Sequence, residues 1–194
     1  MELVPMGSIY VNAGFETFYK CCKHWISRLV DAKRRNGVYM YRIHRAARAA
    51  GLKVTIHFAE AECSASEAEL ATILRWMPDR LGHVIHVPES VKREIAARPG
   101  IGLELCLSCN VKAKMIVGSF DAHHFGEWWR VDGPVVVPCT DDVGVFGSPV
   151  SNEWALIQEH FHLEKDEILS LARKGIDVIF GGDEQKARLR ELMW

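Results

Sequence analysis

Short apolar runs alternate with amphipathic segments from Gly51 to the end of the chain. Alternation of this kind is typical of repeated strand–helix units, which build a parallel sheet covered by helices. The apolar runs have the length of buried strands. They predict four strands, over Lys53–Phe58, Arg80–His83, Ile101–Leu107 and Val135–Thr140.

The amphipathic segments between and after these runs predict helices. The first begins at Ser66-Glu67-Ala68-Glu69, where a serine can cap the helix and the early carboxylates favour its positive end. Pro99-Gly100 predicts the end of the second helix, and Gly175 the end of the fourth. The predicted helices cover Ser66–Trp76, Glu89–Ala97, Glu153–Phe161, Lys165–Lys174 and Glu184–Met193.

The first 50 residues follow a different pattern. Cys21–Arg35 predicts one helix, and Tyr41–Ala50 predicts an amphipathic basic helix that leads into the first strand. Met1–Gly14 shows no clear period, so no element is predicted there.

Composition narrows the class of protein. With 194 residues, of which 48% are hydrophobic and 25% charged, the chain can bury a substantial core as one globular domain. A formal net charge of −1 argues against binding to nucleic acid polymers or anionic membranes by bulk charge. No apolar run approaches the roughly 20 residues that span a bilayer, and no secretory signal is evident. We therefore expect a soluble protein in the cytoplasm.

Six cysteines are present, and several lie within apolar, strand-like runs where buried free thiols are common. Cys106 and Cys109 have the C-x-x-C spacing of half a zinc ribbon or of a redox pair. No second C-x-x-C accompanies them. The pattern favours free thiols in a reducing compartment.

Polar side chains stand at the ends of the predicted strands. His57 and Glu60 follow the first strand, His83 ends the second, and the pair Asp141-Asp142 follows the last. In a β/α barrel the carboxyl ends of the strands point into one shared active site. Imidazoles and carboxylates are zinc ligands, and a nearby acid or base moves protons, so the set predicts a metal-dependent hydrolase.

Each of these signals has a plainer interpretation when taken alone. His57 and Glu60 could belong to a surface loop, His83 could be a hydrogen-bonded core residue, and Asp141 or Asp142 could cap a turn. Other candidates are weaker. The H-x-H of His160-Phe161-His162 lies in a polar helical stretch, and the pair His123-His124 precedes a predicted packing helix with an aromatic face. The loop lysines Lys112 and Lys114 could contact a phosphate or only water.

Four segments in the same order resemble the adenosine deaminase family. The segments His123–Gly126 and Asp141–Phe146 are most similar to its adenosine deaminase-like branch, which acts on N6-methyl-AMP. The resemblance covers residues 46–194 and implies the C-terminal half, strands 5–8, of a (β/α)₈ TIM barrel of the metal-dependent hydrolase superfamily. Residues 1–45 form a divergent segment of uncertain fold. The four segments are Thr55–Glu60, Arg80–His83, Leu103–Asn110 and Cys139–Asp142.

The resemblance also implies roles for the strand-end residues. His57 and Asp141 are implied as ligands of one Zn²⁺, and Glu60 as the acid that protonates the purine at N1. His83 is implied to orient the attacking water and help deprotonate it, and Asp142 to accept a hydrogen bond from the purine or the attacking oxygen. The implied reaction converts adenosine or N6-methyl-AMP to inosine or IMP and releases ammonia or methylamine.

One departure from the family changes what is expected. The family's first strand carries an H-x-H whose histidines complete the zinc site, and no such motif precedes His57. The ligand set is then incomplete, and a half barrel leaves open sheet edges that favour self-association. Two alternatives therefore stay open: an inactive half barrel that binds purine or dimerises, and another metal hydrolase acting on phosphoesters or amides.

Overall fold

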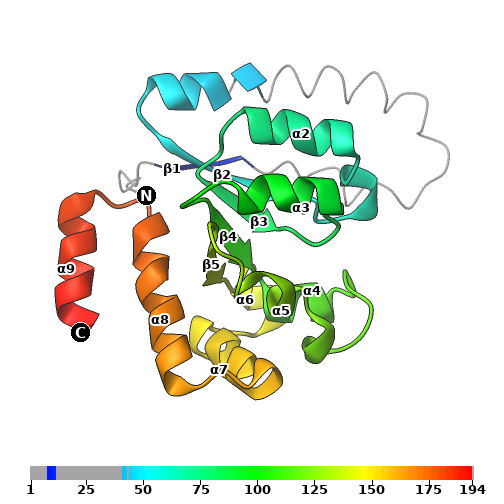
Figure 1. The fold of residues 1–194 in the computed structure, drawn as a ribbon, viewed down its shortest axis with the longest axis vertical. Coiled ribbons are helices and arrows are strands. Elements are labelled where there is room, and N and C mark those ends of the chain that lie inside the picture. The colour runs from blue at the N-terminus through cyan, green and yellow to red at the C-terminus, as the bar shows by residue number, and fades with distance from the viewer. Residues whose placement is uncertain (1–7, 12–40, 43, 194) are drawn as a thin grey trace.

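Five parallel strands form a single sheet in chain order, β1-β2-β3-β4-β5, in the computed structural model, which describes residues 8–11, 41–42 and 44–193 (Figure 1). Because strands that follow each other in the chain are also neighbours in the sheet, the sheet progresses in one direction as in a β/α barrel. The strands are β1 (Ser8–Val11), β2 (Lys53–Phe58), β3 (Arg80–His83), β4 (Gly102–Leu105) and β5 (Val135–Pro138).

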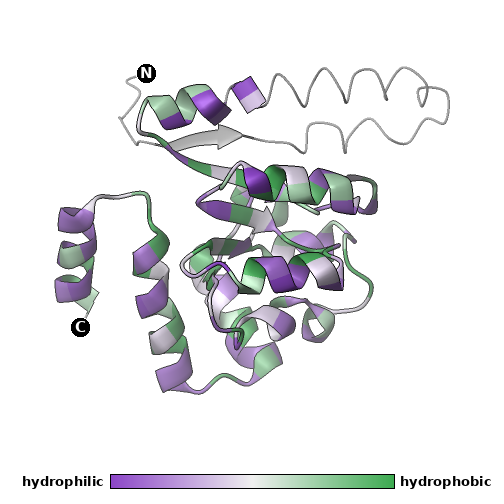
Figure 2. Cartoon of the chain, turned by 45° about the horizontal axis from the view of Figure 1, so that its top comes forward, coloured by the Kyte–Doolittle hydropathy of each residue, from purple (hydrophilic) through white to green (hydrophobic). Residues whose placement is uncertain are grey.

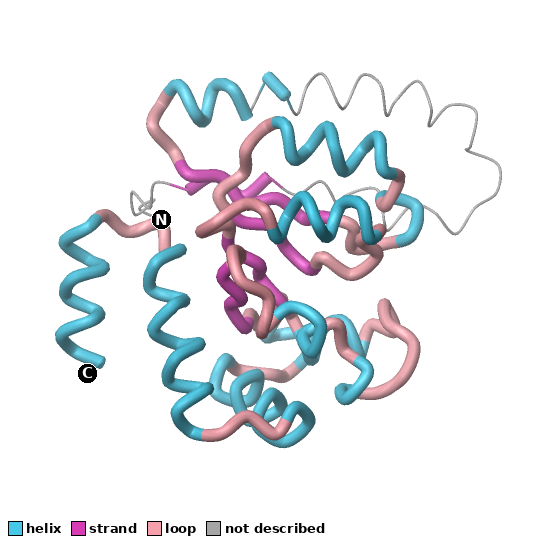
Figure 3. The backbone as a smooth tube through the Cα atoms, viewed as in Figure 1, coloured by secondary structure: helices cyan, strands magenta, loops and turns pink. Residues whose placement is uncertain are grey.

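Helices surround this sheet (Figure 3). Residues 44–49 are helical and lead into β2, as the basic amphipathic pattern predicted. The α-helices are α2 (Glu67–Arg75), α3 (Glu89–Ala96), α4 (Leu107–Lys112), α5 (Phe125–Trp128), α6 (Val143–Phe146), α7 (Val150–Phe161), α8 (Lys165–Gly175) and α9 (Asp183–Met193), and the 3₁₀ turns are η2 (Glu62–Ser64), η3 (Phe120–Ala122) and η4 (Ile176–Val178).

The predicted strands are confirmed, with two changes at their ends. β2 and β3 have the predicted bounds, whereas β4 and β5 are shorter than the apolar runs that contain them. The short helix α4 begins at Leu107, and its first four residues, Leu107–Asn110, are buried. The buried sequence therefore continues past the end of β4, which is why the predicted strand was too long. α8 ends at Gly175, as predicted, and the 3₁₀ turn η4 follows it directly.

One strand was not predicted. β1 pairs with β2 in parallel, with Ser8 opposite Lys53 and Val11 opposite Ile56. A run of four residues is too short to show a period in sequence, so the pairing comes from the neighbouring strand. The helix predicted over Cys21–Arg35 lies outside the described residues.

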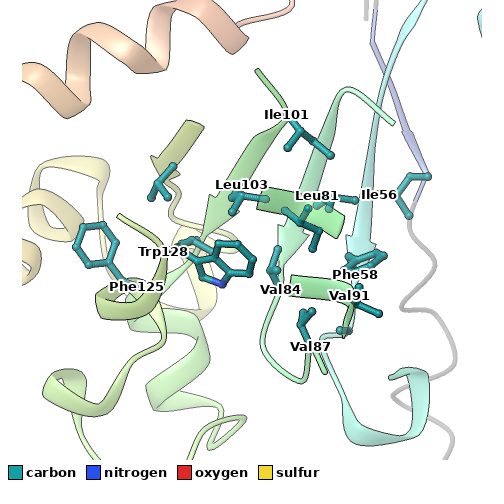
Figure 4. Packing of buried hydrophobic residues seen from close by; sticks show 14 of the residues in the cluster. Ile56, Phe58, Leu81, Val84, Val87, Val91, Ile101, Leu103, Phe125 and Trp128 are labelled. Carbon is teal, nitrogen blue, oxygen red and sulfur yellow. The ribbon is translucent and has the colours of Figure 1, made fainter. Parts of the chain in front are cut away.

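The hydrophobic core lies between the sheet and the helices that cover it. Leu81 of β3 and Leu103 of β4 are fully buried and lie close to each other, with Trp128 of α5 near them (Figure 4). Leu70 and Leu74 of α2 are also fully buried. Burying such side chains contributes about 1.5–3 kcal/mol each, so the strand–helix layers account for much of the stability.

The outer helices are more polar. In Figure 2 much of α9 is coloured as hydrophilic, and that helix has no buried residue. None of the helices in the described ranges combines the length and the apolar character needed to cross a membrane.

A buried carboxylate ties α7 to the beginning of α4. Glu153 is fully buried and accepts a hydrogen bond from the backbone N–H of Ser108 at 3.1 Å. The hydroxyls of Ser108 and Ser148 donate to the same side chain. α4 follows directly on β4, so this contact helps to fix the loop at the carboxyl end of the sheet.

Replacing Glu153 by alanine should lower the free energy of unfolding by about 2–4 kcal/mol, because the donors of Ser108 and Ser148 would be buried without a partner. Urea denaturation followed by circular dichroism measures the change. Glu159→Ala, an exposed position on the same helix, should change the stability by less than about 0.5 kcal/mol. Equal losses in the two variants would contradict a specific role for the buried carboxylate.

Candidate active site and metal centre

Four of the predicted site residues meet at the carboxyl edge of the sheet. His57 lies on β2, His83 ends β3, and Phe58 is opposite His83 in the parallel register. Glu60 follows β2 in the next loop, and Asp141 follows β5. Because parallel strands end at a common edge, residues that are far apart in the sequence share one site.

Short distances join four of these side chains. His57 Nδ1 lies 3.1 Å from Glu60 Oε2. His83 Nε2 lies 3.7 Å from both Glu60 Oε1 and Asp141 Oδ2. The two imidazole rings are edge to face, with their centroids 4.5 Å apart. Nitrogen and oxygen donors therefore surround one small volume.

Gly82 makes room for the His57 ring. Gly82 lies opposite His57 in the β2–β3 pairing, and a Cβ on Gly82 would come within 3.3 Å of His57 Cδ2. That separation is tighter than an ordinary van der Waals contact. Glycine at this position thus lets the imidazole lie close to the backbone of β3.

The backbone at the site is strained at several residues. Ala59, His83, Val84 and Asp141 all have positive φ, between 49° and 63°, although none is glycine. Such conformations cost free energy and persist where the surrounding structure holds them, which is common at functional sites. Here Val84 N–H donates to Phe58 O at 3.0 Å, which fixes the turn after β3 to the end of β2.

Electrostatics in the site favour an ionised Glu60. Burial opposes ionisation, but the hydrogen bond from His57 and the electrostatic influence of the two neighbouring imidazoles outweigh it, so the pKa of Glu60 is lowered. The Cys109 thiol behaves differently: burial and its hydrogen bond to Asp141 raise its pKa well above the ordinary value. Cys109 Sγ lies 2.9 Å from Asp141 Oδ2 and donates to it as a neutral thiol.

Three buried polar residues, Asn110, His123 and His124, form a hydrogen-bond network with the ring and the main chain of His83. The side-chain amide of Asn110 lies 3.0 Å from His83 Nδ1 and also 3.0 Å from His123 Nε2. His124 Nε2 donates to the main-chain oxygen of His83 at 2.6 Å. Burial lowers the pKa of His123 to about 2 and that of His124 to about 4, so both rings are neutral near pH 7.

The sequence interpretation assigned no role to Asn110, His123 or His124, and it treated Cys109 as an ordinary buried thiol. The adjacent pair His123-His124 before the aromatic residues of α5 was the available signal. Its weakness is physical, because two histidines beside a short helix are compatible with a solvated surface as well as with a buried network. The buried network can be told from a solvated surface only once the structure shows that α4 and α5 pack near the end of β3.

The donor atoms fit a zinc ion. Two overlapping groups have all their ligating atoms within 4.8 Å of one another: His57, Glu60 and His83, and His83, Cys109 and Asp141. Zn²⁺ binds imidazole nitrogen, carboxylate oxygen and thiolate sulfur in tetrahedral sites. A cavity of about 360 Å³ opens beside them, within the range for small-molecule ligands, and its lining includes His57, His83, Glu104, Cys139 and Asp141.

Several candidates lie apart from this centre. Asp142 is exposed, stands immediately before α6 and belongs to neither of the two groups. His160 pairs with Asp121 and stacks on Phe120. Lys112 donates to the main-chain oxygen of Phe146.

The C-x-x-C spacing does not mark a disulfide. Cys106 and Cys109 are both free, as are the other cysteines that the described ranges contain.

Comparison with known proteins places the fold. The family model for adenosine deaminase matches residues 31–194. N6-Methyl-AMP deaminase from Bos taurus is 37% identical over 150 residues, which are 75% of this chain and 42% of that protein. The structure of Arabidopsis ADAL complexed with IMP matches with a TM-score of 0.70 and 33% identity, over 77% of this chain and 42% of the other.

A solved structure of lower sequence identity supports the fold assignment only. A cog1816 amidohydrolase from Burkhoderia ambifaria, solved with bound Zn, matches with a TM-score of 0.66 at 22% identity, over 79% of this chain and 43% of the other. The parallel sheet and its helices therefore form part of the TIM-barrel fold of these amidohydrolases, as predicted. The chain spans about 42% of the length of the relatives that it matches.

Gly82→Ala should weaken Zn²⁺ or Co²⁺ binding about tenfold, because the new methyl group would displace the His57 imidazole. Isothermal titration calorimetry of the metal-free chain measures the affinity. Gly175→Ala is the matched control, since its Cβ would make an ordinary contact of 3.9 Å with Val137. Unchanged metal affinity in Gly82→Ala would exclude His57 from the metal centre.

His124→Gln should reduce the loss of stability in acid. The unfolded chain takes up a proton at this histidine below about pH 6.5, whereas the folded chain resists it down to about pH 4. Stability contributed by the neutral ring is thus present above pH 6.5 and lost as the pH falls toward 4. Glutamine keeps a donor for His83 O without titrating, so the slope of unfolding free energy against pH should fall by about 1.4 kcal/mol per pH unit in this window. An unchanged slope in urea titrations would contradict the buried neutral state.

Proposed function

Because the chain belongs to the adenosine deaminase family, in its N6-methyl-AMP deaminase branch, we propose that its site hydrolyses the C6–N bond of a 6-amino or 6-methylamino purine. Adenosine would give inosine and ammonia, and N6-methyl-AMP would give IMP and methylamine. The observation that carries the proposal is the convergence of His57, Glu60, His83 and Asp141 on one small volume beside a cavity.

We propose zinc as the metal of this site, with His57 and Asp141 as its protein ligands. Bound zinc lowers the pKa of its water to about 7 and so supplies a nucleophile at neutral pH. The Nδ1 of His57 faces Glu60, an arrangement in which a histidine donates Nδ1–H to a carboxylate and offers Nε2 to a metal. No H-x-H precedes His57 in the chain, so these two side chains are the ligands that the family pattern assigns to it.

The remaining site residues act on the purine and the attacking water. Glu60, ionised in the free site, would take up the proton that the attacking water loses and pass it to N1 of the ring, which makes C6 more electrophilic. His83 would orient the water beside it, since its Nε2 lies 3.7 Å from two carboxylates of the site. Asp142, at the rim before α6, would accept a hydrogen bond from the purine or the attacking oxygen. The bound IMP of the Arabidopsis relative supports a nucleotide as the ligand.

We further propose that residues 46–194 are the C-terminal half of a deaminase barrel and that residues 1–45 are a divergent segment. The family match covers all of residues 46–194, and it begins at residue 31, inside the segment proposed as divergent.

A second candidate is a module that binds purine or dimerises without turnover. The open sheet favours it, because among the described residues β1 and β5 are edge strands with one neighbour each. Size-exclusion chromatography with light scattering distinguishes a monomer of the chain from a dimer. A dimer would support the module, and a monodisperse monomer would count against its dimerising form.

Glu60→Gln should reduce turnover of N6-methyl-AMP by about 10²–10⁴-fold, because glutamine cannot donate the proton to N1. The change in purine absorbance, with AMP and adenosine measured alongside, reports turnover by the chain supplied with Zn²⁺. Glu62→Gln is the matched control, since Glu62 is exposed in the same loop, and it should retain activity. Unchanged turnover in Glu60→Gln would reject the deaminase mechanism and favour a phosphoester or amide hydrolase, while no turnover by the folded parent chain would favour the binding module.

A further inference from the structure

A buried chain of polar groups runs from the active site to α5. His83, Asn110 and His123 are 1%, 0% and 2% exposed, so their polar atoms must satisfy one another. Asn110 stands between the two imidazoles, with its amide 3.0 Å from His83 Nδ1 and 3.0 Å from His123 Nε2. Phe125 N–H closes the chain at 3.0 Å from His123 Nδ1.

The Phe125 end of the chain has a fixed direction. A backbone N–H can only donate, so His123 Nδ1 must accept and cannot carry a proton. A neutral imidazole then has its proton on Nε2, toward Asn110. Burial keeps the ring neutral, and protonation of both nitrogens would set two donors against each other at Phe125.

This direction determines the orientation of the Asn110 amide. With Oδ1 toward His83, the amide nitrogen would face His123 Nε2, and His123 would need two acceptor nitrogens and a negative charge. A half turn of the amide removes the conflict, because the oxygen then accepts from His123 Nε2–H. The amide NH₂ group consequently donates to His83 Nδ1.

We infer that Asn110 is a positioning residue that holds His83 as the tautomer with its proton on Nε2. That proton points into the site, where Nε2 lies 3.7 Å from Glu60 Oε1 and 3.7 Å from Asp141 Oδ2. The tautomer itself is independent of the proposed function, whereas its catalytic meaning rests on that function.

The tautomer restricts what His83 can do in the proposed reaction. With Nδ1 accepting from Asn110 and Nε2 protonated, His83 has no free lone pair with which to bind a metal ion or to take a proton from water. It can donate a hydrogen bond to the oxygen of the attacking water and orient it. The proton that the water loses must then pass to a carboxylate.

The main chain of His83 is held by the same segment. His124 Nε2 donates to His83 O at 2.6 Å, and His83 has a φ of 63°. Adjacent histidines thus fix both parts of one residue: His123, through Asn110, orients the ring, and His124 supports the strained backbone. A shift of α5 would therefore alter the site without touching a ligand or a substrate.

Nitrogen-15 NMR of the full chain tests the tautomer directly. Long-range ¹H–¹⁵N correlation spectra of histidine-labelled, metal-free protein distinguish protonated from unprotonated ring nitrogens, and His83→Gln assigns the resonances. We expect a protonated Nε2 and an unprotonated Nδ1 in both His83 and His123. A protonated Nδ1 in His83 would overturn the inference, whatever the result of the activity assay.

Two further spectra test the route through Asn110. In His123→Phe the amide loses its fixed direction, so the two His83 nitrogen resonances should move toward each other as tautomers mix. The control His162→Asn, at the exposed end of α7, should leave them in place. Resonances that stay fixed in His123→Phe would show that Asn110 does not transmit the direction from Phe125.

Zinc addition separates this inference from the proposed function. The Nε2 proton of His83 should persist when Zn²⁺ is added, and its loss would make His83 a metal ligand and overturn the inference. A chain with the expected tautomer that does not deaminate any purine would refute only the proposed function. A chain that deaminates with a protonated Nδ1 on His83 would refute only the inference.

Discussion

The parallel register of the strands is the constraint on which the site depends. β2, β3 and β5 end at one edge of the sheet, so polar residues placed after each strand meet although more than 80 positions of sequence separate His57 from Asp141. The apolar residues before those ends are buried between the sheet and the helices, which holds the register: a slip of one residue would turn each strand's side chains to the opposite face.

Within that frame, the geometry of the site comes from close packing and from backbone strain. Gly82 admits the His57 ring, and positive φ at His83 and Asp141 sends each side chain into the site where the strand has just ended. Such conformations cost about 1–3 kcal/mol each and need support from their surroundings. His123 and His124, which directly precede α5, provide part of that support: His124 through a hydrogen bond to the main chain of His83, and His123 by way of Asn110 to its ring.

Family membership does not by itself imply activity, because the described strands form an open sheet and not a closed barrel. The chain spans about 42% of the length of the relatives that it matches, and its proposed metal centre rests on side chains from only part of a barrel. A site with fewer protein ligands binds zinc more weakly, because each ligand contributes to the affinity and restricts the geometry. Glu60 and His83, the proposed acid and the proposed water-orienting residue, nevertheless lie together in this part of the barrel.

The sequence by itself determined the strand–helix alternation, the bounds of β2 and β3 and the set of polar strand ends, because these depend on local periodicity and on residue type. It did not reveal β1, whose four residues show no period, or the end of β4, where apolar sequence continues into α4. Only the tertiary structure brought Cys109 to Asp141, left Asp142 at the exposed rim, and connected Phe125 to His83. Those relations depend on how short helices pack against strand ends, and hydrogen-bond direction in a buried network follows from contacts that no sequence spacing contains.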